Sequence, residues 1–149
     1  MGLRDQINSD LMAAMKSKET KRLSVLRMMK TAIKNKEVEL RRELEDAQVI
    51  QVLLTMIKQR KDSIEQFTRG GRSDLAEKES GEIRIIEEYL PAAVTEAEME
   101  KAVEDAIRQI GAASLKDMGK VMKACMERFA GRPVDGAKVN ALVKNKLAN

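Results

Sequence analysis

The 149-residue sequence contains no histidine, one cysteine, two prolines and three aromatic residues. The lack of histidine removes the usual general base near neutral pH and the commonest metal ligand. Phosphate-binding loops, dinucleotide-binding glycine patterns and nucleophile elbows are also missing. No apolar run approaches the roughly 18 residues that can span a bilayer, and the sequence shows neither a secretory signal nor a pair of cysteines. We therefore expect a cytoplasmic protein with no membrane partner.

The candidate catalytic groups are few. Cys125 shares an apolar helical face with Phe129, a pattern that favours an inert buried side chain over a reactive thiol. The carboxylates of Glu82, Glu87 and Glu88 can in principle bind a divalent cation or act as an acid and a base. No surrounding pattern marks a pocket, so we interpret them as a solvated acidic helix face. We expect no catalytic residue, no metal site and no cofactor, and no enzymatic activity of the chain by itself.

What the sequence does contain predicts an all-α fold. Ten methionines stand beside the three aromatic residues, and charged residues make up 35% of the chain. Apolar residues recur at helical spacing through seven segments, without the alternation that is typical of strands. The segments begin near positions 3, 20, 45, 74, 95, 116 and 135. We therefore predict seven helices and no sheet.

Pro91 predicts a boundary and a flexible joint between two domains, residues 1–90 and 91–149, because the residue before proline is disfavoured in a helix. In the N-terminal domain we expect the second and third helices to form an antiparallel hairpin with the first helix packed on it, a small bundle. Asp74 and Glu77 have the spacing of a capping box at the start of the fourth helix.

The small helical C-terminal domain holds the most informative stretch, Lys116–Lys146. A capping box of Thr95 and Glu98 opens its first helix. Gly131 is placed to end a later helix in the left-handed conformation, and Asp135 is placed to cap the helix that follows. Lysines at 116, 120 and 123 lie opposite the apolar face of the helix that precedes Gly131. The stretch predicts two short helices with a basic outer surface.

The formal charge of +4 conceals an uneven distribution. Residues 16–42 contain ten basic and three acidic side chains, a local charge of +7. Residues 74–105 contain three basic and eleven acidic side chains, a local charge of −8. Residues 106–149 contain nine basic and three acidic side chains, a local charge of +6. A polyanion is therefore drawn to particular surfaces rather than to the whole molecule.

Lysines opposite an apolar stripe are ordinarily only the solvent-facing side of a helix. The block charge near the C-terminus and the Gly-rich turn within it favour phosphate binding instead. The scarcity of aromatic residues argues against single-strand binding, and the last helix offers few side chains for reading DNA bases. Structured RNA recognised by shape fits better. The candidate RNA-binding residues are Lys116, Lys120, Lys123, Arg128, Arg132, Lys138, Asn140 and Lys144.

Several motifs in order carry a resemblance to a known family. They are Gly71–Glu79, Tyr89–Pro91, Lys116–Met122, Asp135–Gly136 and Leu142–Lys144. Together they cover essentially the whole chain, which resembles the YqeY-like proteins. The resemblance implies an all-α fold with a helical N-terminal part and a small helical C-terminal domain.

The YqeY-like proteins are in turn similar to the C-terminal tail of the B subunit of bacterial Asp/Glu-tRNA amidotransferase (GatB). In that enzyme the tail helps to recognise tRNA, and the resemblance implies that the stretch around Lys120, Lys123, Gly136, Asn140 and Lys144 corresponds to the nucleic-acid-facing tail. The family label of a carbon–nitrogen ligase with glutamine as amide donor belongs to the amidotransferase. This chain has neither a Ser-rich amidase site nor a phosphate-binding site, so we do not expect that activity from it alone.

Three functions remain open at this point. The first is a free-standing module that binds tRNA or another structured RNA. The second is a protein-interaction module, in which the acidic stretch 74–105 or the long hairpin docks a partner. The third is an accessory protein that acts only together with amidotransferase subunits. Binding of the first kind weakens steeply as salt rises, whereas the third requires activity that appears only when the other subunits are added.

Overall fold

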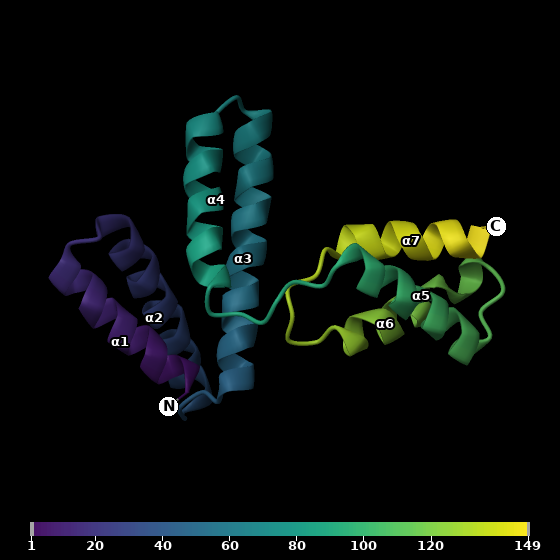
Figure 1. Cartoon of the computed structure of the whole chain (residues 1–149), viewed down its shortest axis with the longest axis horizontal. Coiled ribbons are helices and arrows are strands. Elements are labelled where there is room, and N and C mark those ends of the chain that lie inside the picture. The colour runs from purple at the N-terminus through teal and green to yellow at the C-terminus, as the bar shows by residue number, and fades with distance from the viewer. Residues whose placement is uncertain (1, 149) are drawn as a thin grey trace. The chain divides into compact units, whose positions relative to one another are not determined.

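The computed structural model describes residues 2–148, which form seven α-helices and one short 3₁₀-helix without a β-strand among them (Figure 1). The all-α prediction is confirmed. The chain divides into two compact units, Met1–Leu90 and Pro91–Asn149. The buried apolar residues form two separate clusters, one in each unit. Each unit therefore has its own hydrophobic core.

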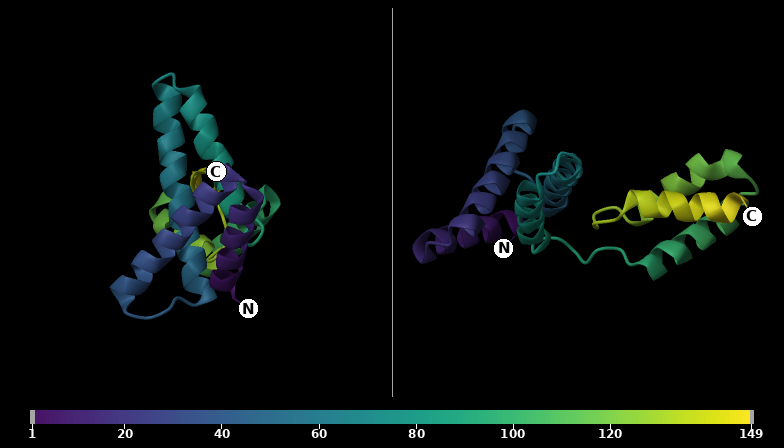
Figure 2. Two further views of the ribbon diagram at one scale, coloured as in Figure 1. Left: turned by 90° about the vertical axis from the view of Figure 1, so that its left-hand side faces the viewer. Right: turned by 90° about the horizontal axis from the view of Figure 1, so that it is seen from above.

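Unit 1 contains four helices that pair along the chain, first with second and third with fourth. They are α1 (Leu3–Ser17), α2 (Thr20–Leu40), α3 (Asp46–Arg69) and α4 (Ser73–Glu87). The turn between α3 and α4 has a left-handed glycine at position 71, and the two helices run side by side in both views of Figure 2. The predicted hairpin of the second and third helices is therefore wrong.

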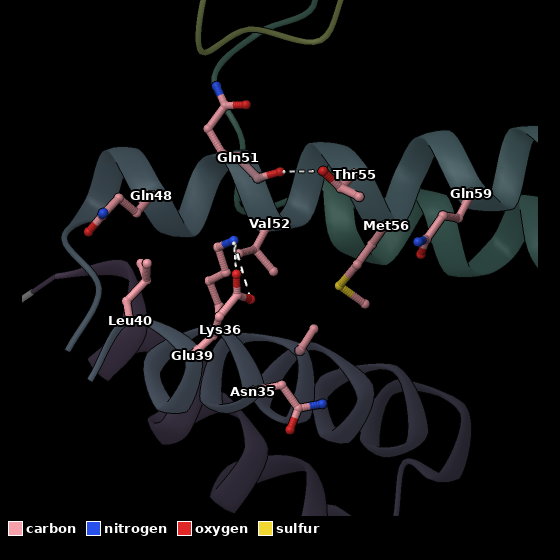
Figure 3. A pocket seen from close by; sticks show the side chains of 11 residues that line it. Asn35, Lys36, Glu39, Leu40, Gln48, Gln51, Val52, Thr55, Met56 and Gln59 are labelled. Atoms are coloured by element: carbon pink, nitrogen blue, oxygen red, sulfur yellow. Dashed lines mark hydrogen bonds and ion pairs between the residues drawn. The ribbon is translucent and has the colours of Figure 1, made fainter. Parts of the chain in front are cut away.

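A cleft separates the later half of α2 from the first half of α3. Its volume is about 450 Å³ (Figure 3). Apolar side chains line it together with amides, the Thr55 hydroxyl and the Lys36–Glu39 pair. The polar lining residues are Asn35, Lys36, Glu39, Gln48, Gln51, Thr55 and Gln59.

Ion pairs with low solvent exposure hold α3 against α4. The Arg60 guanidinium, with only 12% of its side chain exposed, donates to Glu82 at 3.1 Å and lies 3.8 Å from Glu79. Burial, then the neighbouring charge of Glu82, raises the pKa of Glu79. Glu82 is thus a packed ion-pair partner, and its assignment to a solvated acidic face is wrong.

The end of α4 is tied to α1 and α2 through Tyr89. Its hydroxyl donates to Asp10 at 2.5 Å and accepts from Arg22 at 3.2 Å. Burial, then the bond to Asp10, raises the pKa of Tyr89. At the other end of α4 the predicted cap is wrong, because the helix begins at Ser73 and Asp74 pairs with its neighbouring arginine instead.

Unit 2 is a bundle of three helices with a short 3₁₀ turn. Its elements are α5 (Glu96–Ile110), η1 (Leu115–Asp117), α6 (Met118–Arg128) and α7 (Gly136–Ala148). The predicted capping box of Thr95 and Glu98 is confirmed at the start of α5. Within residues 2–148, no helix combines the length and the apolar character that crossing a membrane requires.

Candidate nucleic-acid interface

The 3₁₀-helix η1 and helix α6 expose three of the candidate lysines, Lys116 on η1 and Lys120 and Lys123 on α6. The Ser114 hydroxyl accepts from the backbone N–H of Lys116 and starts η1, which continues into α6. Val121 and Cys125 are buried one turn apart on the inner face of α6. Because a helix has 3.6 residues per turn, Lys116, Lys120 and Lys123 fall on the opposite side, and all three are exposed.

Helix α7 carries three further candidates, Lys138, Asn140 and Lys144. The Asp135 carboxylate accepts from the backbone N–H of Ala137 at 3.1 Å and caps the helix as predicted. Three apolar residues, Val139, Val143 and Leu147, are buried along its inner face. Asn140 and Lys144 are exposed. The helical period alone puts the buried residues on one face of α7 and the exposed residues on another.

Three of the eight candidates form ion pairs with α5 or with residues just before it. Arg128 pairs with Asp105 at 3.0 Å, and Lys138 pairs with Glu96 at 3.0 Å. The Arg132 guanidinium pairs with Glu98 at 2.8 Å and also donates to the carbonyls of residues 92 and 93. These contacts tie α6, α7 and the loop between them to α5.

The same contacts set the ionisation of the groups that make them. The hydrogen bond from Arg128 lowers the pKa of Asp105, and the hydrogen bond to Glu96 raises the pKa of Lys138. The pKa of Glu98 is lowered first by the backbone N–H of Thr95 and then by Arg132. All of these shifts favour the charged forms, so the pairs persist at neutral pH.

The other four basic candidates have no such partner. Lys116, Lys120, Lys123 and Lys144 form no ion pair with any carboxylate of residues 2–148. We call these four residues the lysine surface. The eight candidates thus divide into three neutralised cations, four cations that face solvent, and the neutral amide Asn140.

The topology of unit 2 brings the lysine surface toward one end. Glu96 pairs with Lys138 and Glu104 with Lys146, so α5 and α7 run in the same direction (Figure 1). Helix α6, which lies between them in the sequence, runs in the opposite direction. The short helix η1 at its start contacts α7. Lys144, near the end of α7, therefore lies at the same end of the unit as η1 and the first turn of α6.

Sequence reasoning missed one further cation. Lys101 is exposed on α5 and forms no ion pair within the described residues. It lies inside the acidic stretch 74–105, so a count of local charge conceals it. Its helical position relative to the buried Ala102 and Val103 was the signal that could have revealed it.

A comparison with protein families decides the relationship of the chain. The model of the family described as Yqey-like protein matches residues 4–147. The chain belongs to this family. The resemblance noted from the sequence motifs is therefore confirmed.

Curated relatives of this Yqey-like chain come from yeasts. Each is named "Altered inheritance of mitochondria protein 41, mitochondrial". The relative from Lachancea thermotolerans is 37% identical over 70% of this chain and 57% of its own length. The relative from Kluyveromyces lactis is 39% identical over 58% of this chain and 47% of its own length. The relative from Saccharomyces cerevisiae is 35% identical over 63% of this chain and 51% of its own length. The chain thus spans about half the length of the curated relatives it matches.

The cytoplasmic location expected from the sequence is contradicted by these relatives, whose names place them in mitochondria. The expectation relied on a missing secretory signal and on a single cysteine. Neither feature separates the cytoplasm from another compartment in which thiols stay reduced, so the physical basis of the expectation was too weak.

The Yqey-like chain offers little chemistry beyond charge. Cys125 is 1% exposed, and burial raises the pKa of its thiol, which keeps the thiol in its unreactive protonated form. No group of three or more acidic or cysteine side chains within residues 2–148 is placed to hold a metal ion. What unit 2 can do with the lysine surface is bind anions.

Proposed function

We propose that this Yqey-like chain binds structured RNA, with tRNA as the first candidate, and contacts its phosphates through the lysine surface. The observation that carries the proposal is the division of basic residues in unit 2. Those that face α5 are neutralised by its carboxylates, whereas the lysine surface extends into solvent without an anionic partner in residues 2–148.

Lysine suits contacts to phosphate rather than to base edges. Its ammonium is a point charge on a flexible stem, and each phosphate that it neutralises releases condensed counterions. Such contacts fix the position of a nucleic acid without reading its sequence. Asn140 adds a neutral amide that can donate to a phosphate or sugar oxygen. Recognition by this surface therefore depends on the shape of the RNA.

Family membership makes tRNA the first RNA to test. The YqeY-like proteins resemble the tail of the amidotransferase B subunit, which helps to recognise tRNA. That resemblance supports the choice of Lys120, Lys123, Asn140 and Lys144 as the residues to test. The proposal asks for no catalysis by this chain.

The structure weakens the reasons for a docking role of the acidic stretch 74–105. Most of its carboxylates are bound within their own unit, such as Glu82 by Arg60 and Glu88 by Arg22. In unit 2 the same holds for the α5 carboxylates that pair with α6, α7 and their connecting loop. No comparable observation favours an accessory role beside amidotransferase subunits.

Charge reversal tests the proposal directly. The variant Lys120→Glu, Lys123→Glu, Lys144→Glu changes only exposed positions, so each change should shift the free energy of unfolding by no more than about 0.5 kcal/mol. At moderate salt we expect its affinity for tRNA to fall by about tenfold or more in a filter-binding assay.

A matched control separates this effect from net charge. Lys58, Lys61 and Lys78 are exposed in unit 1 and form no ion pair within residues 2–148. Their reversal to Glu changes the net charge by the same amount and should leave tRNA affinity close to that of the parent. If the unit 2 variant binds tRNA as tightly as the parent, the lysine surface is only a solvated helix face.

A further inference from the structure

A second basic stripe lies on the α1–α2 hairpin, whose helices pack side by side (Figure 1). Arg27, Lys30 and Lys34 follow one another at i, i+3 and i+7 on α2, and all three are exposed. Met29 and Ile33 on the other side of the helix are buried. At about 1.5 Å per residue the three cations cover roughly 10 Å of helix. We call them the hairpin stripe.

The nearest carboxylate is already bound. Glu37 accepts from Arg4 at 2.7 Å and from the backbone N–H of Leu44 at 2.9 Å, with 12% of its side chain exposed. Lys30 and Lys34 form no ion pair within residues 2–148. Like charges one turn apart on a helix repel each other, so an external anion at this position relieves the repulsion.

The stripe borders a concave surface rather than a flat one. A hollow of about 220 Å³ between α1 and α2 is lined by Asn8, Lys30 and Lys34, by the Arg4–Glu37 ion pair, and by the buried Ile7 and Ile33. The Asn8 amide makes no hydrogen bond within the described residues. Two ammonium groups and an amide donor around a hollow are a suitable arrangement for the oxygens of a phosphate group.

We infer that the hairpin stripe is a second phosphate-binding surface, one that unit 1 presents to structured RNA. This inference rests on the proposed function of unit 2. A nucleic-acid duplex carries about one phosphate charge per 1.7 Å of its axis, so the hairpin stripe can face several phosphates at once.

Apolar residues near the stripe do not favour a lipid or protein partner over RNA. Met12 and Met15 on α1 are 61% and 53% exposed, and Val38, one turn after Lys34 on α2, is 71% exposed. Single exposed apolar side chains are normal on protein surfaces. Helices that lie on membranes bury Trp, Phe or Leu, and residues 3–40 contain no aromatic side chain. The stripe itself carries three cations and no apolar side chain.

The test compares three full-length variants for binding to tRNA across a salt titration. The hairpin variant is Arg27→Gln, Lys30→Gln, Lys34→Gln, and its matched control is Lys58→Gln, Lys61→Gln, Lys78→Gln. The third is the unit 2 variant with Glu at positions 120, 123 and 144. We expect the hairpin variant to bind about tenfold or more weakly at moderate salt, with a log–log salt slope lower by up to three. Circular dichroism checks that each variant keeps its helices.

The outcomes separate the two proposals. The inference is supported if the hairpin variant binds tRNA more weakly and with a lower salt slope while the control binds like the parent. If the hairpin variant binds like the parent while the unit 2 variant loses affinity, the function of unit 2 stands and the inference is overturned. If no variant changes binding, both proposals fail. A hairpin variant that keeps its RNA affinity but no longer binds phosphatidylglycerol vesicles also overturns the inference, in favour of a lipid surface.

Discussion

At the scale of single residues, Glu37 shows what one partly buried carboxylate contributes to unit 1. It joins α2 to Arg4 on α1 and to the backbone of Leu44, just before α3. The hydrogen bond from Arg4, and after it the one from Leu44, lowers the pKa of Glu37 below its ordinary 4.5. Its folded-state pKa is therefore lower than its unfolded-state pKa.

This shift predicts how stability depends on pH. A carboxyl with a depressed folded pKa contributes fully above its unfolded pKa, and the contribution is lost as pH falls through the folded pKa. We predict that Glu37→Gln lowers the free energy of unfolding by about 1–3 kcal/mol at neutral pH. It should also flatten the loss of stability on acidification, measured by urea unfolding between about pH 3 and pH 7. An equally steep acid limb in parent and variant would contradict this role.

The sequence could identify the basic candidates, but it could not show which of them form ion pairs. The burial of Cys125 was predictable, because its apolar neighbours lie within one or two turns of the same helix. The neutralisation of Lys138 was not, because its partner Glu96 is 42 residues away in the sequence. Arg128 and Asp105 are likewise 23 residues apart. Helical spacing carries no information about contacts between helices, so only the structure could separate bound cations from free ones.

At the scale of helices, capping gives a prediction with an internal control. Thr95 accepts from the backbone N–H of Glu98 at 3.1 Å and caps α5. We expect Thr95→Ala to lower the free energy of unfolding of unit 2 by about 1 kcal/mol. Asp74 has the same sequence signature but caps nothing, so Asp74→Ala should leave the stability close to that of the parent. Denaturant unfolding measures both, and equal losses would refute the assignment of the caps.

Helix existence and helix ends followed from the sequence, but helix pairing did not. The glycines at 71, 111 and 131 adopt the left-handed conformation expected of helix stops. Helices α3 and α4 are joined by the ion pair of Arg60 with Glu82, which lie 22 residues apart in the sequence. The predicted α2–α3 hairpin considered apolar spacing alone, and apolar stripes do not specify which neighbour covers them.

At the scale of the whole molecule, the two hydrophobic clusters predict independent responses to core mutations. Leu53 is fully buried in the cluster of unit 1. Leu53→Ala leaves a cavity and should cost unit 1 about 2–5 kcal/mol. Because unit 2 has its own core, we expect its amides to keep their parental protection in native-state hydrogen exchange. Equal loss of protection in both units would show that they unfold as one.

The central claim is that solvent-facing lysines of unit 2 bind phosphates whereas the ion-paired cations support the fold. The salt dependence of tRNA binding tests it most directly, in two variants that each remove two positive charges. For Lys120→Gln with Lys123→Gln we predict a log–log slope lower by about two and unchanged stability. For Arg128→Gln with Lys138→Gln we predict the parental slope and a small loss of stability, because exposed ion pairs contribute little. Equal slope changes in the two variants, or a parental slope in the first, would contradict the claim.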